Sequence, residues 1–159
     1  SSITELANQE LTLEGHNIRV VRALYEALSA RDVVTVHRLL ASDIEWWFHG
    51  PPVHQHMMRL LTGASSISLS SEASFLFLPV SVTAIGPTVL VEGCNKERSI
   101  SWVHAWTVTD GIVTQVREYF NTSLTVTRFE TSSSNSCFHC LPLWQSKLSG
   151  DGPGLVLAI

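Results

Sequence analysis

Apolar positions in the first third of the chain recur at helical spacing. Across residues 17–30 the pattern predicts an amphipathic helix, because large apolar side chains return every three or four positions: Ile18, Val21, Tyr25 and Leu28. Asp32 is a suitable N-cap for a second, short helix, whose apolar side would be formed by Val33, Val36, Leu39 and Leu40. Residues 1–15 are polar and acidic, and we expect them to form a flexible arm ahead of the domain.

Strands are predicted for most of the remaining chain. The aromatic run at 46–48 suits a pleated surface and predicts a first strand, and a third helix is expected to follow it and end near Gly63. Residues 75–85 and 88–92 flank Gly86-Pro87. If those two residues form the loop, Val82 lies opposite Val91 and Ala84 lies opposite Val89.

A second hairpin signal follows at Asp110-Gly111, between an alternating strand at 99–109 and a last strand at 112 to about 127. Helices first and consecutive antiparallel strands afterwards predict an α+β fold, with the helices packed on one face of a curved sheet. One domain is expected over residues 16–128. The Ser- and Gly-rich tail at 129–159 is expected to lack regular structure, except where 141–144 or 155–159 dock on the domain.

The strand at 99–109 separates its side chains by size. One face carries large groups, namely Ile100, Trp102, His104, Trp106 and Val108, whereas the other carries mostly small ones. Rings around one imidazole are typical of a small-molecule pocket. They are also typical of a core in which His104 is hydrogen-bonded to a backbone carbonyl, and this strand alone favours the core.

The register of the second hairpin decides what lies beside His104. A two-residue loop at Asp110-Gly111 pairs His104 with Arg117, whereas a three-residue loop with a bulge pairs His104 with Val116 and Trp102 with Glu118. In the second arrangement a carboxylate in an apolar cavity could share a proton with the imidazole and act in proton transfer. The sequence is compatible with both registers.

Composition narrows the classes of function. The chain has 159 residues, of which 45% are hydrophobic and 15% charged, so it can build a sizeable core. Its net charge of −4 argues against a nucleic-acid partner, and no long apolar run suggests a membrane span. Three cysteines fit a reducing compartment better than a disulfide scaffold. We therefore expect a cytoplasmic protein, with the nucleus as a second compartment.

Histidines and cysteines outside the strands give only weak signals. His49, His54 and His56 invite a metal interpretation, but His54 and His56 are two residues apart and would point to different sides of a helix. The pair Cys137 and Cys140 lies in the tail without further ligands nearby in the sequence. No metal and no cofactor are expected.

Three stretches of the sequence resemble a known family. EWWFHGPPVHQHMMRLLTG, SISWVHAWTVTDGIVTQVREYFNTSLTVTR and PGLVLAI are similar to the plant wound-induced protein 1 family, with its senescence-associated relatives, in the SnoaL-like branch of the nuclear transport factor 2 superfamily. The resemblance implies a cone-shaped α+β fold: three helices against a strongly curved antiparallel sheet, with a cavity between them. It also implies a homodimer.

The superfamily includes ketosteroid isomerases, polyketide cyclases and limonene epoxide hydrolases. A match to the isomerases puts Val116, Glu118 and Phe120 on the cavity face, and puts His104 where their oxyanion-stabilising acid lies. Their base aspartate has no counterpart in EWWFHGPP, where Glu45 or His49 could stand in only with a shift.

Three hypotheses for function follow. In the first, the cavity binds a small apolar metabolite and is lined by Trp46, Phe48, His49, Trp102, His104, Trp106, Val116, Glu118 and Phe120. In the second, the chain is an isomerase, cyclase or hydrolase with His104 and Glu118 as catalytic residues. In the third, it is a dimeric interaction module. If Trp46 faces inward with Ile44 and Phe48, then Trp47 faces outward and a dimer interface would cover it.

Overall fold

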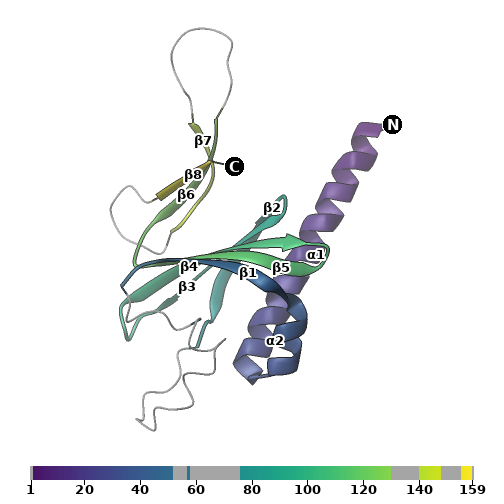
Figure 1. Cartoon of the computed structure of the whole chain (residues 1–159). Helices are drawn as coiled ribbons and strands as arrows, with labels where there is room; N and C mark the ends of the chain where they lie inside the picture. The colour runs from purple at the N-terminus through teal and green to yellow at the C-terminus, as the bar shows by residue number, and fades with distance from the viewer. Residues whose placement is uncertain (1, 52–56, 58–75, 130–139, 148–154, 159) are drawn as a thin grey trace.

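The computed structural model describes residues 2–51, 57, 76–129, 140–147 and 155–158 (Figure 1). Two helices come first, and eight strands follow within the described residues. In chain order they are α1 (Ser2–Ala30), α2 (Val33–Leu39), β1 (Leu40–His49), β2 (Pro79–Ile85), β3 (Thr88–Asn95), β4 (Ile100–Thr109), β5 (Ile112–Phe120), β6 (Leu124–Phe129), β7 (Cys140–Gln145) and β8 (Leu155–Ala158).

The main sheet has five strands in the order β1-β5-β4-β3-β2, and the helices lie against one of its faces, the inner face. The predicted α+β fold class is confirmed. The expected antiparallel pairing is observed from β2 to β5, whereas β1 pairs with β5 in parallel. β1 starts at the residue after α2 ends. β1 therefore continues directly from the C-terminal end of α2.

The first helix is longer than predicted. Its inner side buries Val21, Leu24 and Tyr25, as the apolar spacing indicated. Residues 2–15, expected as a flexible arm, are helical instead. The Glu14 carboxylate ties this part of α1 to the sheet, because it accepts a hydrogen bond of 2.9 Å from the backbone N–H of Gly86. The N-terminal part of α1 projects beyond the sheet (Figure 1).

The second helix begins as predicted. The Asp32 side chain caps it by accepting a hydrogen bond of 3.2 Å from the backbone N–H of Thr35, and Val36 is buried. The third predicted helix lies outside the described residues except for Met57, which is helical and buried.

The Gly86-Pro87 hairpin has the predicted register, with Val82 opposite Val91 and Ala84 opposite Val89. Gly86 has a φ of 57°, which a glycine adopts without the strain that a Cβ would bring.

At the second hairpin both predicted pairings of His104 were wrong. Asp110 and Gly111 form a two-residue loop with φ values of 51° and 77°, which fit a type I′ turn. A bulge in β5 then places one extra residue, Thr114, between the partners of Thr107 and Val108. This extra residue shifts the register by one position, so that His104 lies opposite Glu118.

The strand predicted from 112 to about 127 is divided in two. β5 ends at Phe120, and Asn121 takes a φ of 52°, which breaks the extended backbone before β6. β6 is the central strand of a second sheet with the order β7-β6-β8. The predicted docking of the two tail segments therefore occurs as strand pairing with β6.

The second sheet packs on the outer face of the main sheet. A separate apolar core lies between them, formed by Leu90, Val103, Ala105, Tyr119, Leu124 and Val126. The Glu92 carboxylate, 4% exposed, fastens the end of β7 to this face by accepting hydrogen bonds from the Ser146 hydroxyl at 3.0 Å and the Lys147 backbone at 3.3 Å.

Candidate functional site

A buried histidine–glutamate pair lies on the inner face of the main sheet. His104 on β4 and Glu118 on β5 face each other across the two strands, with His104 Nε2 at 2.7 Å from Glu118 Oε2. Neither side chain has any exposed surface. The prediction that Val116, Glu118 and Phe120 share the inner face with His104 is consistent with the observed pairs, because Trp106 faces Val116 and Trp102 faces Phe120.

Three further side chains complete a hydrogen-bonded network around this pair. The Trp46 indole N–H donates to Glu118 Oε1 at 2.6 Å. The Tyr25 hydroxyl contacts His104 Nδ1, and the Trp106 indole N–H donates to the Tyr25 oxygen at 2.9 Å. The network thus joins α1, β1, β4 and β5. Among the described residues, every polar side-chain atom in it has a partner.

The donor and acceptor capacities of these side chains determine where the protons of the network lie. An indole N–H can only donate, so the Tyr25 oxygen accepts from Trp106 and its own proton is available for His104 Nδ1. His104 then carries its proton on Nε2 and donates it to the Glu118 carboxylate. With the proton on Nδ1 instead, the Tyr25 proton would have no acceptor in the described part of the chain. The Nε2–H tautomer is therefore assigned to His104.

Burial governs the acidity of Tyr25. Loss of solvent raises the pKa of its hydroxyl well above the ordinary value of 10.0. The hydrogen bond from Trp106 opposes this rise in pKa, and the nearby Glu118 charge adds to it. Tyr25 therefore stays protonated across the physiological range and remains a donor to His104.

Aromatic rings enclose His104 on several sides. Ring centroids lie 4.7 Å away for Trp102, 5.1 Å for Phe77 and 5.2 Å for Trp106. The Tyr25 ring stacks on the imidazole with a centroid distance of 5.9 Å and an angle of 24°. The alternation of large side chains on β4 therefore produces a ring cage in the core of the domain.

A cavity of about 350 Å³ lies beside this network. It is bounded by α2, residues 40–46 of β1 and one residue of β5. Its lining residues are Val36, His37, Leu40, Ala41, Ser42, Ile44, Trp46 and Val116. Trp46 thus belongs to both features, because its ring lines the cavity while its N–H binds Glu118.

The predicted ligand-binding residues divide into three groups. Trp46 and Val116 line the cavity. Trp102, His104, Trp106, Glu118 and Phe120 are buried on the inner face next to it, with Phe48 packed against them. His49 lies on the outer face, where its ring stacks on Tyr119 at 4.8 Å and 7°.

The outer face near β1 carries an exposed tryptophan. Trp47 is 52% exposed and lies opposite Arg117 of β5. Glu45 is on the same face, where its carboxylate accepts a hydrogen bond of 3.3 Å from Gln115. This placement takes Glu45 and His49 away from the His104–Glu118 pair. The predicted homodimer stays a prediction.

Sequence reasoning missed Tyr25 and Phe77, and it missed the part of the cavity that α2 contributes. Tyr25 was placed on the apolar side of a helix, where a tyrosine signals that its hydroxyl needs a buried partner. Nothing in the local sequence indicates that this partner is His104, because the two residues are 79 positions apart.

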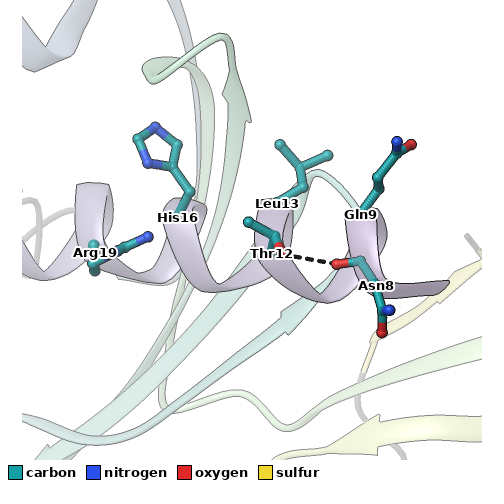
Figure 2. A pocket seen from close by; sticks show the side chains of 6 residues that line it. All are labelled: Asn8, Gln9, Thr12, Leu13, His16 and Arg19. Atoms are coloured by element: carbon teal, nitrogen blue, oxygen red, sulfur yellow. Dashed lines mark hydrogen bonds between the residues drawn. The ribbon is translucent and has the colours of Figure 1, made fainter. Parts of the chain in front are cut away.

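A second hollow lies along the exposed side of the N-terminal half of α1 (Figure 2). It measures about 510 Å³ and is lined by Asn8, Gln9, Thr12, Leu13, His16 and Arg19. Among the described residues only this one helix lines it, so it is an open groove and not an enclosed site.

The described residues contain neither a metal-binding cluster nor a helix that could span a membrane. No group of three or more His, Cys, Asp or Glu side chains there is arranged to hold a metal ion. His54, His56 and Cys137 lie outside the described residues. None of the helices in the described part of the chain is long and apolar enough to cross a membrane.

Solved structures with the same fold support the architecture. A nuclear transport factor 2-like protein from Burkholderia xenovorans is 30% identical, with a TM-score of 0.50 over 67% of this chain and 90% of that one. Bal32a, from a soil-derived mobile gene cassette, is 15% identical with a TM-score of 0.52, also over 67% of this chain and 90% of that one. The second similarity shows the fold alone.

Similarity to curated proteins is closer and covers 64% of the chain. Wound-induced protein 1 of Solanum tuberosum is 55% identical over 108 residues, which is 64% of this chain and all of that protein. Senescence associated gene 20 of Arabidopsis thaliana is 50% identical over 113 residues, again 64% of this chain and all of that protein. The family model for wound-induced protein WI12 matches residues 58–159, which include His104 and Glu118 but not Tyr25 or Trp46. With this match and the shared fold, the chain belongs to the wound-induced protein WI12 family of nuclear transport factor 2-like proteins.

Proposed function

We propose that this protein binds a small, largely apolar metabolite in the cavity between α2, β1 and β5. The cavity itself carries the proposal. Its volume of about 350 Å³ lies in the range of small-molecule sites, and six of its eight lining residues are apolar. The proposal places a metabolite-binding protein in a wound-induced and senescence-associated plant family.

The geometry of the buried pair favours binding over catalysis. A general acid or base must reach the substrate directly or through one water. His104 and Glu118 have no exposed surface, and their polar atoms are already hydrogen-bonded to Trp46, Tyr25 and each other. This arrangement supports a role for the pair in holding the Trp46 wall of the cavity in place.

Capture of a ligand tests the proposal. The protein is incubated with a metabolite extract of wounded plant tissue, analysed by native mass spectrometry, and then denatured so that released molecules can be identified. We expect one specific small molecule, lost in Ala41→Phe, which fills the cavity, and in Trp46→Ala, which removes its wall. Trp47→Ala is the matched control, because this neighbouring ring is 52% exposed on the outer face and should leave capture unchanged.

The second candidate is an enzyme of isomerase, cyclase or hydrolase type, with His104 and Glu118 as its proton-transfer pair. Their contact of 2.7 Å in an aromatic cage is the observation in its favour. Conversion of the captured molecule by the purified protein, abolished in Glu118→Gln, would support the enzyme. If the wild-type protein captures nothing, the dimeric interaction module becomes the better hypothesis.

A further inference from the structure

We infer that the metabolite carries an oxygen head group, a hydroxyl or a carboxylate, which binds at the cavity rim formed by His37 and Ser42 while its apolar body packs against Trp46. This inference rests on the proposed function. It names the chemical class of the ligand and the direction in which the ligand enters.

The lining of the cavity changes in polarity from its rim to its deep end. The two polar residues, His37 and Ser42, are both exposed to solvent. At the deep end, Val116 is fully buried and Val36 is 7% exposed. An apolar group is therefore stabilised inside and a polar group at the rim.

The groups that are free to bond a ligand also lie at the rim of the cavity. The polar atom at the deep end, Trp46 Nε1, already donates to Glu118 Oε1 at 2.6 Å. A ligand oxygen placed there would lose its water without gaining a partner, which is unfavourable. At the rim, the His37 imidazole and the Ser42 hydroxyl form no hydrogen bond to any described residue and can both donate to a ligand oxygen.

Charges around the rim suit an oxygen acceptor. His37 and Arg38 are the basic residues of the last turn of α2. The Arg38 guanidinium donates to the Thr35 hydroxyl at 3.3 Å, so it is held along α2, and His37 remains as the basic group lining the cavity. Both a hydroxyl and a carboxylate have an oxygen that can accept hydrogen bonds from His37 and Ser42. The test below distinguishes these two head groups.

The test uses three probes of one shape: naphthalene, 2-naphthol and 2-naphthoate. Their binding to the full chain is measured by equilibrium dialysis. We expect at least one oxygen-bearing probe to bind more tightly than naphthalene, by about 2- to 10-fold for a hydroxyl and by up to about 100-fold for a carboxylate. Stronger binding of 2-naphthol or of 2-naphthoate identifies the head group.

Single substitutions locate that preference. His37→Ala and Ser42→Ala should each reduce it while leaving naphthalene binding unchanged, because both side chains are exposed and serve only the rim. Trp46→Ala should weaken all three probes. His16→Ala is the control, because this exposed histidine lines the separate groove on α1.

The outcomes separate the inference from the function on which it rests. Equal binding of the three probes, unchanged in the rim variants but lost in Ala41→Phe, would overturn the head-group inference and leave the cavity as a binding site. A preference that disappears in His16→Ala and survives in His37→Ala would also overturn it, because the head group would then lie on α1. Failure of every probe to bind would count against the proposed function itself.

Discussion

Removal of the Tyr25 hydroxyl is the most direct perturbation of the buried network. Tyr25→Phe keeps the ring that stacks on His104 and meets the Trp106 ring at a centroid distance of 5.8 Å. It takes away only the oxygen that accepts from Trp106 Nε1 and contacts His104 Nδ1. Two buried polar atoms then have no partner.

The expected cost follows from those two atoms. A buried polar group left unsatisfied costs about 1–3 kcal/mol, so Tyr25→Phe should lower the free energy of unfolding by about 2–6 kcal/mol. Trp106 is 1% exposed and His104 is fully buried, so solvent cannot replace the lost partner without opening the core. For a chain of this size the loss corresponds to a fall in Tm of about 6–18 °C.

Urea denaturation followed by tryptophan fluorescence measures this loss, together with thermal unfolding. The midpoint should fall with little change in the m-value, because the surface exposed on unfolding stays the same. Tyr119→Phe is the control, because it removes the hydroxyl of a residue on the outer face near the half-exposed Arg117. Tyr119→Phe should lower the free energy of unfolding by less than about 1 kcal/mol. A Tyr25→Phe loss no larger than that of Tyr119→Phe would refute the reasoning.

Three other predictions follow from the same packing. Burial raises the pKa of Tyr25, so its contribution to stability is complete below pH 10, where the unfolded tyrosine is still protonated, and falls as pH rises toward the folded pKa. Between pH 9 and pH 11, the free energy of unfolding measured in urea should fall with pH more steeply than that of Tyr25→Phe, by up to about 1.4 kcal/mol per pH unit. Equal slopes for the two proteins would contradict this prediction. Glu92→Gln should weaken the hydrogen bond from the Lys147 backbone N–H and so speed trypsin cleavage after Lys147. An unchanged cleavage rate would show that this hydrogen bond does not protect the segment. Gly93→Ala should destabilise by about 3 kcal/mol in thermal unfolding, because the new Cβ would lie 2.4 Å from the Trp102 ring, and a neutral effect would mean that this ring moves freely.

Much of the inner face could be predicted from the alternation of side chains. The pattern at 99–109 placed the rings and His104 together, and the resemblance to known proteins placed Val116, Glu118 and Phe120 with them. The pairing of His104 with Glu118 could not be predicted from the turn residues alone. It depends on a single bulged residue, Thr114, and one extra residue moves every later pair by one position.

Other features depend on segments that lie far apart in the chain. The outward direction of Trp47 was one of two open alternatives, because adjacent residues of a strand always face opposite sides. The parallel pairing of β1 with β5 joins segments about 70 positions apart, which local patterns do not encode. The helical conformation of residues 2–15 depends partly on Glu14, whose partner Gly86 is 72 positions away.

These separations in sequence also affect the time for which the folded chain persists. The bonds from Tyr25 to His104, from Trp46 to Glu118 and from Trp106 to Tyr25 span 79, 72 and 81 positions. Contacts of such long range form only after large loops have closed, so we expect the network to be absent from much of the folding transition state. Interactions that form after the transition state slow unfolding and leave the folding rate nearly unchanged. The network would then form late in folding and prolong the lifetime of the native chain by slowing its unfolding.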